Sequence, residues 1–345
     1  MPLGAIIAAI IVLYAVINVL AVKYYGETEF WAALGKVILI IALIIFTFVV
    51  MLGGNPKGDR FGFRYWHTPG AFTTMYYEGP LGCFLGFLQC MILASFTNSG
   101  PEYVSMAAGE AGNPRKSMPR AFNATFYRLT TFFMLGALCL GILVPYNDSE
   151  MAAAFISAAP GAAASPYVVA MNRLNIKILP SIVNGAVFLL ALSAGNSLFY
   201  CASRSLYGLA LGGKVPKLFI KCSKSGVPIY AVALVSIISL ISLLQLSAST
   251  AQVLNWFIAL VTASLLMNYS CIALSYICFY RVLKVQGIDR QSLPYTAWFM
   301  PYAAYYALAG TVFMTLAGGY AVFLKDNWDT ATFFFSYVSL RSSVT

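Results

Sequence analysis

Charged side chains are scarce in this chain, which has only 9% Asp, Glu, Lys and Arg among its 345 residues. A soluble globular domain has roughly 25%. The low charge, the 60% of hydrophobic residues and the mean hydropathy of +0.80 therefore exclude an ordinary soluble protein. Because the apolar runs are long enough for helices that cross a bilayer, the composition predicts an all-α, polytopic membrane protein.

Residues and motifs of common enzyme classes are also scarce. The chain has one histidine, His67, in a polar loop, and its seven cysteines lie mainly in apolar runs without metal-like or disulfide-like spacing. It contains no HExxH, no phosphate-binding P-loop, no Rossmann glycine pattern and no G-x-S-x-G with a partner histidine. The sequence therefore predicts a protein that is not an enzyme and has neither a metal site nor a cofactor.

Positive charge is abundant relative to negative charge, with a net charge of +10. The basic residues are divided among short loops between hydrophobic runs, which is the pattern that encodes membrane topology. We therefore expect the basic residues to orient the chain in a lipid bilayer, and we expect no binding to nucleic acid.

A helix needs about twenty apolar residues to cross a bilayer, and this rule predicts one transmembrane domain over residues 1–345. Alternate loops contain thirteen and six basic residues, and the richer set is expected on the cytoplasmic side. This orientation places residue 1 outside, so an odd number of spans is expected before Met1, and the apolar tail is expected to begin a further span. The predicted spans lie near residues 4–22, 30–52, 80–108, 126–146, 178–210, 227–247, 251–281 and 297–324.

Two charged residues, Lys36 and Glu102, fall well inside predicted spans. A charge at membrane depth costs at least about 2.5 kcal/mol, so such residues usually face a protein interior or an aqueous pathway. Lys36 has two interpretations: its side chain extends to the interface, or it is a buried ammonium that exchanges a proton.

Glu102 follows a break in the apolar pattern, "FTNSGPE", at residues 96–102. Gly100 supplies a flexible point and Pro101 lacks a backbone donor. A broken helix exposes amides and carbonyls that can bind the charged ends of a small zwitterion. The alternative is a proline kink of purely structural effect, which would not require a carboxylate beside it.

A small polar patch in the span 178–210 includes Asn196 and Ser197. Small residues in a transmembrane helix indicate close packing, and lining of a coupling-ion site is the alternative interpretation.

Several motifs, in order along nearly the whole chain, resemble one family. They include "GETEFWAALGKV", "GNPKGDRFGFRYWHTPGAF", "GPEYVSMAAGEAGNPRKSMPRAF", "AGNSLFYCASRSLYGLALGGKVPKLF" and "VLNWFIALVTASLL". The chain resembles the fungal amino acid permeases of the amino acid-polyamine-organocation superfamily. The resemblance implies a helical bundle with leucine-transporter-type inverted repeats, in which the predicted spans correspond to helices four to eleven of twelve. The first three helices and most of the last would then be absent, leaving an incomplete bundle of about eight spans.

The resemblance also implies a function: symport of an amino acid with protons, importing it across the plasma membrane by alternating access. The proton-coupling residues implied are Lys36, Asn196 and Ser197. The implied substrate contacts are Phe96, Thr97, Asn98, Ser99, Gly100 and Glu102. Because the unwound first helix that completes the site in this family has no counterpart here, the chain could be inactive as a fragment.

Two further functional hypotheses belong to other classes. The chain could be a nutrient sensor built on a transporter scaffold, or a partner of an intact permease that does not itself transport.

Overall fold

The structure is a computed structural model that describes residues 3–20, 22–97, 100–109, 113–156, 165–223, 226–246, 250–293, 295–297, 299–325 and 327–342. Within these ranges every regular element is a helix or a short helical turn. The predicted all-α class is therefore confirmed.

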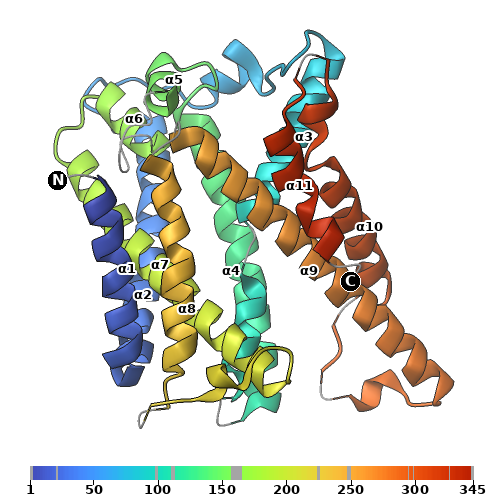
Figure 1. Ribbon diagram of the computed structural model, residues 1–345. Coiled ribbons are helices and arrows are strands. Elements are labelled where there is room, and N and C mark those ends of the chain that lie inside the picture. Colours follow the sequence, from blue (N-terminus) through green and yellow to red (C-terminus); the bar gives the residue numbers. More distant parts are fainter. Residues whose placement is uncertain are drawn as a thin grey trace. The chain divides into compact units, whose positions relative to one another are not determined.

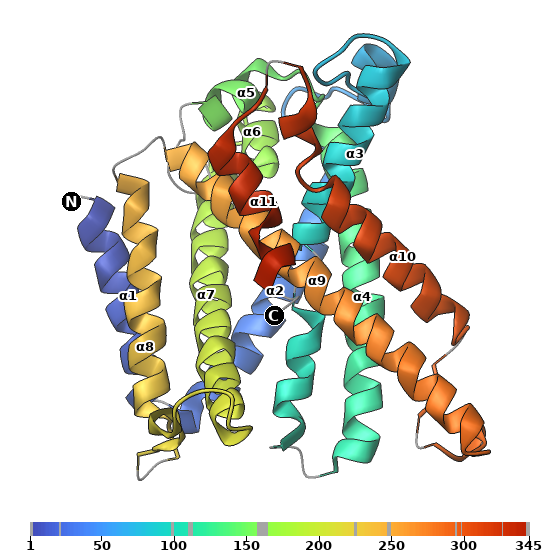
Figure 2. The same ribbon diagram turned by 45° about the vertical axis from the view of Figure 1, so that its right-hand side comes forward.

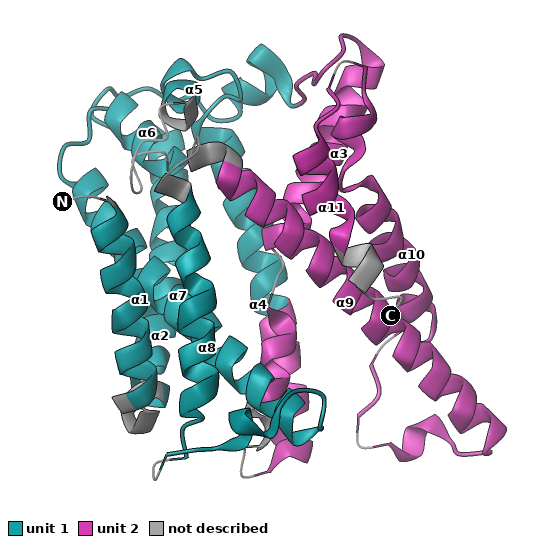
Figure 3. Cartoon of the chain, in the orientation of Figure 1, with its two compact units in different colours: residues 1–71, 127–247 teal, residues 72–126, 248–345 magenta. Residues whose placement is uncertain are grey.

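The chain divides into two compact units (Figure 3). Unit 1 comprises residues 1–71 and 127–247, and unit 2 comprises residues 72–126 and 248–345. The long helix α4, Pro114–Leu143, contributes its first part to unit 2 and its second part to unit 1.

In its described residues, unit 1 contains six further α-helices and three short helical turns. They are α1 (Leu3–Leu20), α2 (Val22–Met51), α5 (Ser149–Ile156), α6 (Pro166–Arg173), α7 (Leu179–Leu211), α8 (Ile229–Ser239), η1 (Trp66–Gly70), η4 (Lys217–Ile220) and η5 (Leu240–Leu246). Helix α1 packs against α8, and α7 contacts α2, α6 and α8 (Figures 1 and 2). The main core of the unit lies between α2, α4, α6 and α7, where Ile142, Leu143 and Met171 are fully buried.

Where the structure describes it, unit 2 contains four further α-helices and three short helical turns. They are α3 (Pro80–Thr97), α9 (Thr250–Val285), α10 (Tyr302–Ala317), α11 (Thr330–Ser342), η2 (Pro101–Gly109), η6 (Arg290–Ser292) and η7 (Tyr320–Phe323). Helix α9 is the centre of this unit, since α3, α10 and α11 all pack against it.

Proline and glycine define several helix ends. Pro80, Pro114 and Pro166 each occupy the first position of a helix, where the missing N–H costs no hydrogen bond. Gly213 follows α7 with a φ of 71°, and Gly287 follows α9 with a φ of 67°. Glycine adopts this left-handed conformation without the steric cost that other residues have.

Five helical segments in the described part of the chain are long and apolar enough to cross a membrane. They are Gly26–Met51, Pro80–Met106, Pro114–Leu143, Leu179–Leu211 and Val253–Val285. Gly4–Val19, Ile229–Leu244 and Tyr302–Ala317 are shorter apolar helices. Each predicted span overlaps one of these eight segments, and the positions of the spans in a bilayer remain predictions. Large apolar side chains such as Ile38 and Leu189 are exposed on these helices, as a surface in contact with lipid requires.

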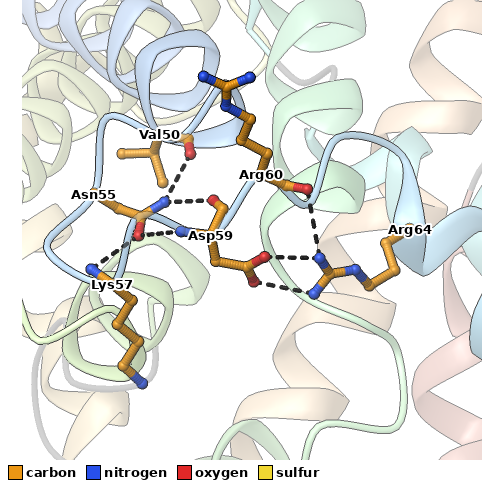
Figure 4. Close-up of polar contacts among 6 residues, drawn as sticks. All are labelled: Val50, Asn55, Lys57, Asp59, Arg60 and Arg64. Atoms are coloured by element: carbon orange, nitrogen blue, oxygen red, sulfur yellow. Dashed lines mark hydrogen bonds and ion pairs between the residues drawn. The ribbon is translucent and has the colours of Figure 1, made fainter.

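The loop after α2 is organised by a buried asparagine (Figure 4). The Asn55 amide donates to the carbonyls of Val50 and Asp59 over 3.0 and 2.7 Å, and its oxygen accepts from the backbone N–H groups of Lys57 and Asp59. Arg64 forms a bidentate pair with the Asp59 carboxylate, at 3.0 and 2.7 Å. The hydrogen bond from Arg64 holds the pKa of Asp59 below its ordinary value.

Arg173 at the end of α6 connects three neighbouring elements. Its guanidinium donates to the Leu143 carbonyl at the end of α4 over 2.6 Å and to the Asp148 carboxylate over 3.1 Å, and it lies 5.1 Å from the Tyr65 ring centroid. Asp148 in turn accepts from the Met151 N–H in the first turn of α5. This arginine therefore satisfies a free helix-end carbonyl and orients α5 and α6 at the end of α4.

Candidate functional site

The break predicted in the span 80–108 is present in unit 2. Helix α3 ends at Thr97, whose hydroxyl donates to the Ala94 carbonyl over 2.9 Å, and η2 begins at Pro101. Between them Gly100 has a φ of 110°, and its carbonyl accepts from the Tyr103 N–H. The left-handed glycine and the missing proline N–H together end the regular helix at this point.

The break is shorter than predicted at its N-terminal side. We expected the unwound segment to begin at Phe96, but Phe96 and Thr97 still belong to α3. Their backbone groups can remain helical because the sequence up to Thr97 contains no glycine or proline after Gly86. Two predicted substrate contacts, Asn98 and Ser99, lie outside the described residues.

Glu102 has a partner that the sequence did not reveal. The Tyr269 hydroxyl, from the middle of α9, donates to the Glu102 carboxylate over 2.6 Å, and the backbone of Gly100 hydrogen-bonds to the same hydroxyl. Both Glu102 and Tyr269 are half-buried. Tyr269 therefore connects α9 to both sides of the Gly100-Pro101 step.

The sequence signal for this contact was weak. A carboxylate at membrane depth requires a partner, but Tyr269 is one of three tyrosines in α9, with Tyr276 and Tyr280. Only the packing of α9 beside the break distinguishes Tyr269 from the other two.

Unit 2 also encloses a cavity of about 340 Å³ between α3, α9, α10 and α11. Neither Gly100 nor Glu102 is among its lining residues. The cavity combines apolar side chains with the polar side chains of Gln89, Asn255, Thr262, Thr332 and Ser336.

In unit 1, Lys36 lies in a three-membered polar cluster between α2 and α7. Its ammonium is 3.3 Å from the Glu29 carboxylate and donates to the Ser193 hydroxyl over 3.0 Å. The Ser193 hydroxyl donates in turn to the Glu29 carboxylate, with distances of 3.1 and 3.2 Å to its two oxygens. The side chains of Lys36 and Glu29 are 35% and 28% exposed, so they are partly removed from solvent.

Glu29 is the member of this cluster that sequence analysis missed. We placed residues 23–29 in a loop, whereas α2 begins at Val22 and includes Glu29. Because Glu29 and Lys36 are then separated by two helical turns, their long side chains extend along the same face of α2. The spacing of seven residues in "ETEFWAALGK" was the signal that could have identified the pair.

The predicted coupling residues of α7 have other partners. Asn196 is buried and its side-chain oxygen accepts from the Asn18 amide of α1 over 2.9 Å. Ser197 donates to the Ser193 carbonyl one turn earlier in its own helix. The α7 residue that Lys36 contacts is therefore Ser193. Within the described residues, the hydrogen bonds of Asn196 and Ser197 go to Asn18 and to the Ser193 carbonyl.

A larger cavity of about 750 Å³ lies between α1, α7 and α8 in unit 1. Its walls are almost entirely carbon, with Ile7, Ile11, Leu198 and Leu234 among the lining residues. Such a surface offers few partners for the charged ends of a zwitterion. In the described part of the chain, no group of three or more His, Cys, Asp or Glu side chains could hold a metal ion.

Comparison with known sequences identifies the family. A family model described as amino acid permease matches residues 1–344. The chain belongs to the amino acid permease family. The resemblance inferred from its motifs is therefore confirmed, and the family that it indicates consists of permeases and not of enzymes.

Individual permeases of fungi are similar over almost the whole chain. A general amino acid permease of Saccharomyces cerevisiae is 48% identical over 97% of this chain and 57% of its own length. A proline-specific permease of Emericella nidulans is 40% identical over 97% of this chain and 61% of its own length. A dicarboxylic amino acid permease of S. cerevisiae is 37% identical over 98% of this chain and 56% of its own length. The chain thus spans less than two thirds of the length of these relatives.

Proposed function

We propose that this chain transports an amino acid across the plasma membrane as a proton-coupled importer, with the break at Gly100 moving during alternating access. The observation that carries the proposal is the interrupted helix of unit 2, in which a left-handed glycine and a proline precede a carboxylate held by Tyr269. Its family membership supports a transport role, and the names of its relatives support an amino acid as the substrate.

The proposed substrate site uses the backbone at the break. A helix interrupted at membrane depth leaves amides and carbonyls without intrahelical partners, and these groups can bind the carboxylate and ammonium of an amino acid. Glu102 adds a negative charge beside them. The proposed contacts are Phe96, Thr97, Asn98, Ser99, Gly100 and Glu102.

The proposed coupling site lies around Lys36 in unit 1, with Asn196 and Ser197 on the adjacent helix α7. Three charged or polar groups, Lys36, Glu29 and Ser193, lie within 3.3 Å of one another on helices long enough to cross a membrane. Groups of this kind inside a membrane domain are typical of proton pathways.

Uptake into liposomes containing the purified chain tests the proposal. We expect radiolabelled amino acid to accumulate when the outside is more acidic than the inside, and accumulation to fall about tenfold in Lys36→Ala or when an ionophore collapses the gradient. Lys177→Ala is the matched control, because Lys177 is an exposed lysine outside the spans. Uptake that is unaffected by both Lys36→Ala and the ionophore would contradict proton coupling, and absence of uptake of any amino acid would contradict transport.

A further inference from the structure

The proposed coupling site contains one acidic residue among its three members, Glu29. It contacts both the ammonium of Lys36 and the hydroxyl of Ser193. If transport is coupled to a proton at this cluster, one of its members binds and releases that proton.

The hydrogen bonds of the cluster fit one arrangement of charges. Lys36 donates to Ser193, Ser193 donates to Glu29, and Lys36 is also paired directly with Glu29. A protonated amine and an ionised carboxylate satisfy this closed arrangement, because the amine then donates to both partners and the serine hydroxyl has a single proton to donate. The pair as a whole is therefore neutral.

The two ionisable members differ in the conditions under which they change charge. A carboxylate takes up a proton at mildly acidic pH, whereas a lysine ammonium gives one up only at alkaline pH. Of the two members, an ionised carboxylate has a free site for an incoming proton, whereas a protonated amine has none.

The neighbouring helices α7 and α1 contain other ionisable groups. On α7 the ionisable side chains are Tyr200, Cys201, Arg204 and Tyr207, and the first of them lies two helical turns, about 10 Å, beyond Ser193. On α1 the ionisable residue of the described side chains is Tyr14, which packs against Phe199 of α7. On α2 itself Glu27 is exposed.

We propose that Glu29 is the group that takes up and releases the coupled proton, with Lys36 as its permanent counter-ion. The inference rests on the proposed proton-coupled transport and assigns its proton to one carboxylate. Binding of a proton to a Glu29 oxygen converts the carboxylate to a neutral carboxyl group, while Lys36 keeps its own proton. The cluster then changes from neutral to singly positive, and the charge-assisted link between α2 and α7 through Ser193 is weakened.

Liposomes loaded with a pH-sensitive dye test this assignment in the full chain. For the wild-type chain we expect added amino acid to acidify the interior as it enters. In Glu29→Gln we expect this acidification to disappear, while counterflow exchange of labelled for unlabelled amino acid, which needs no net proton movement, continues and shows that the variant is folded. Glu29→Asp, which retains a carboxylate, is expected to restore acidification at least in part.

Glu27→Gln is the matched control, because Glu27 lies on the same helix and is exposed. It should acidify the interior like the wild-type chain. Acidification that persists in Glu29→Gln, or that is lost equally in Glu27→Gln, overturns the assignment to Glu29 alone. Amino acid entry without acidification in the wild-type chain, or no entry, overturns the proposed function and this inference with it.

Discussion

Replacement of Tyr269 by phenylalanine removes one oxygen from the contact between α9 and the broken helix. The lost atom donates to Glu102 over 2.6 Å and also hydrogen-bonds to the backbone of Gly100. Phenylalanine retains the ring, so the packing of α9 is preserved and the change is confined to these polar contacts.

The size of the effect follows from the charge of the acceptor. A hydrogen bond to a charged group contributes about 1.5–3 kcal/mol. Because Glu102 and Tyr269 are half-buried, water replaces part of the lost interaction, and we take the lower value of about 1.5 kcal/mol. If the substrate binds the conformation that Tyr269 maintains, this loss weakens amino acid binding about tenfold.

The assay is the concentration dependence of amino acid uptake, supplemented by equilibrium binding of labelled amino acid. We expect Tyr269→Phe to raise KM about tenfold and to leave the maximal rate within about twofold of the wild-type value. Tyr276→Phe is the control, because Tyr276 is a half-buried tyrosine of the same helix whose ring packs against Phe279. An unchanged KM in Tyr269→Phe, or an equal rise in Tyr276→Phe, would refute the role of the Tyr269 hydroxyl.

Two further predictions concern ion pairs of unit 1. Arg173→Leu leaves the nearly buried Asp148 carboxylate without its cation. The free energy of unfolding should fall by about 2 kcal/mol, which a lower Tm in detergent would show. Lys177→Leu is the control and should leave Tm nearly unchanged. The hydrogen bond from Arg64 lowers the pKa of Asp59 in the folded chain below the ordinary 3.8. The pair therefore stabilises the fold at pH values above 3.8, and this contribution is lost as the pH falls through the lowered pKa. The Tm difference between wild type and Asp59→Asn should therefore be smaller at about pH 3 than at pH 7, and a constant difference would contradict this reasoning.

The break in the helix could be predicted because it depends on neighbouring residues. Glycine and proline restrict the backbone by their own covalent structure, so "SGPE" indicated an interruption without any knowledge of the rest of the fold. Its N-terminal limit was placed too early, at Phe96, because that limit was taken from the resemblance to the permease family. A threonine can remain helical when its hydroxyl bonds to its own helix, as Thr97 does with Ala94.

The start of α2 shows the opposite limitation. The charges in "KYYGETE" suggested a loop between two spans, but the helix extends through them from Val22. Charged residues with long side chains are compatible with a helix end near the membrane surface, where their charged groups reach water or each other. Glu29 was therefore left out of the candidate site because the predicted span began at residue 30, one position after it, and not because of its chemistry.

The sequence by itself determined that the chain is helical, membrane-embedded and a member of the permease family, and it identified Lys36 and Glu102 as its two unusual charges. Apolar length, charge distribution and glycine or proline stereochemistry are properties of short stretches, so they can be read without a fold. The tertiary structure alone decided the partners: Glu29 and Ser193 for Lys36, Tyr269 for Glu102, and Asn18 for Asn196. Apart from the pairing of Lys36 with Glu29 along one face of α2, these contacts join residues more than 150 positions apart, and only the packing of one helix against another brings such side chains within hydrogen-bonding distance.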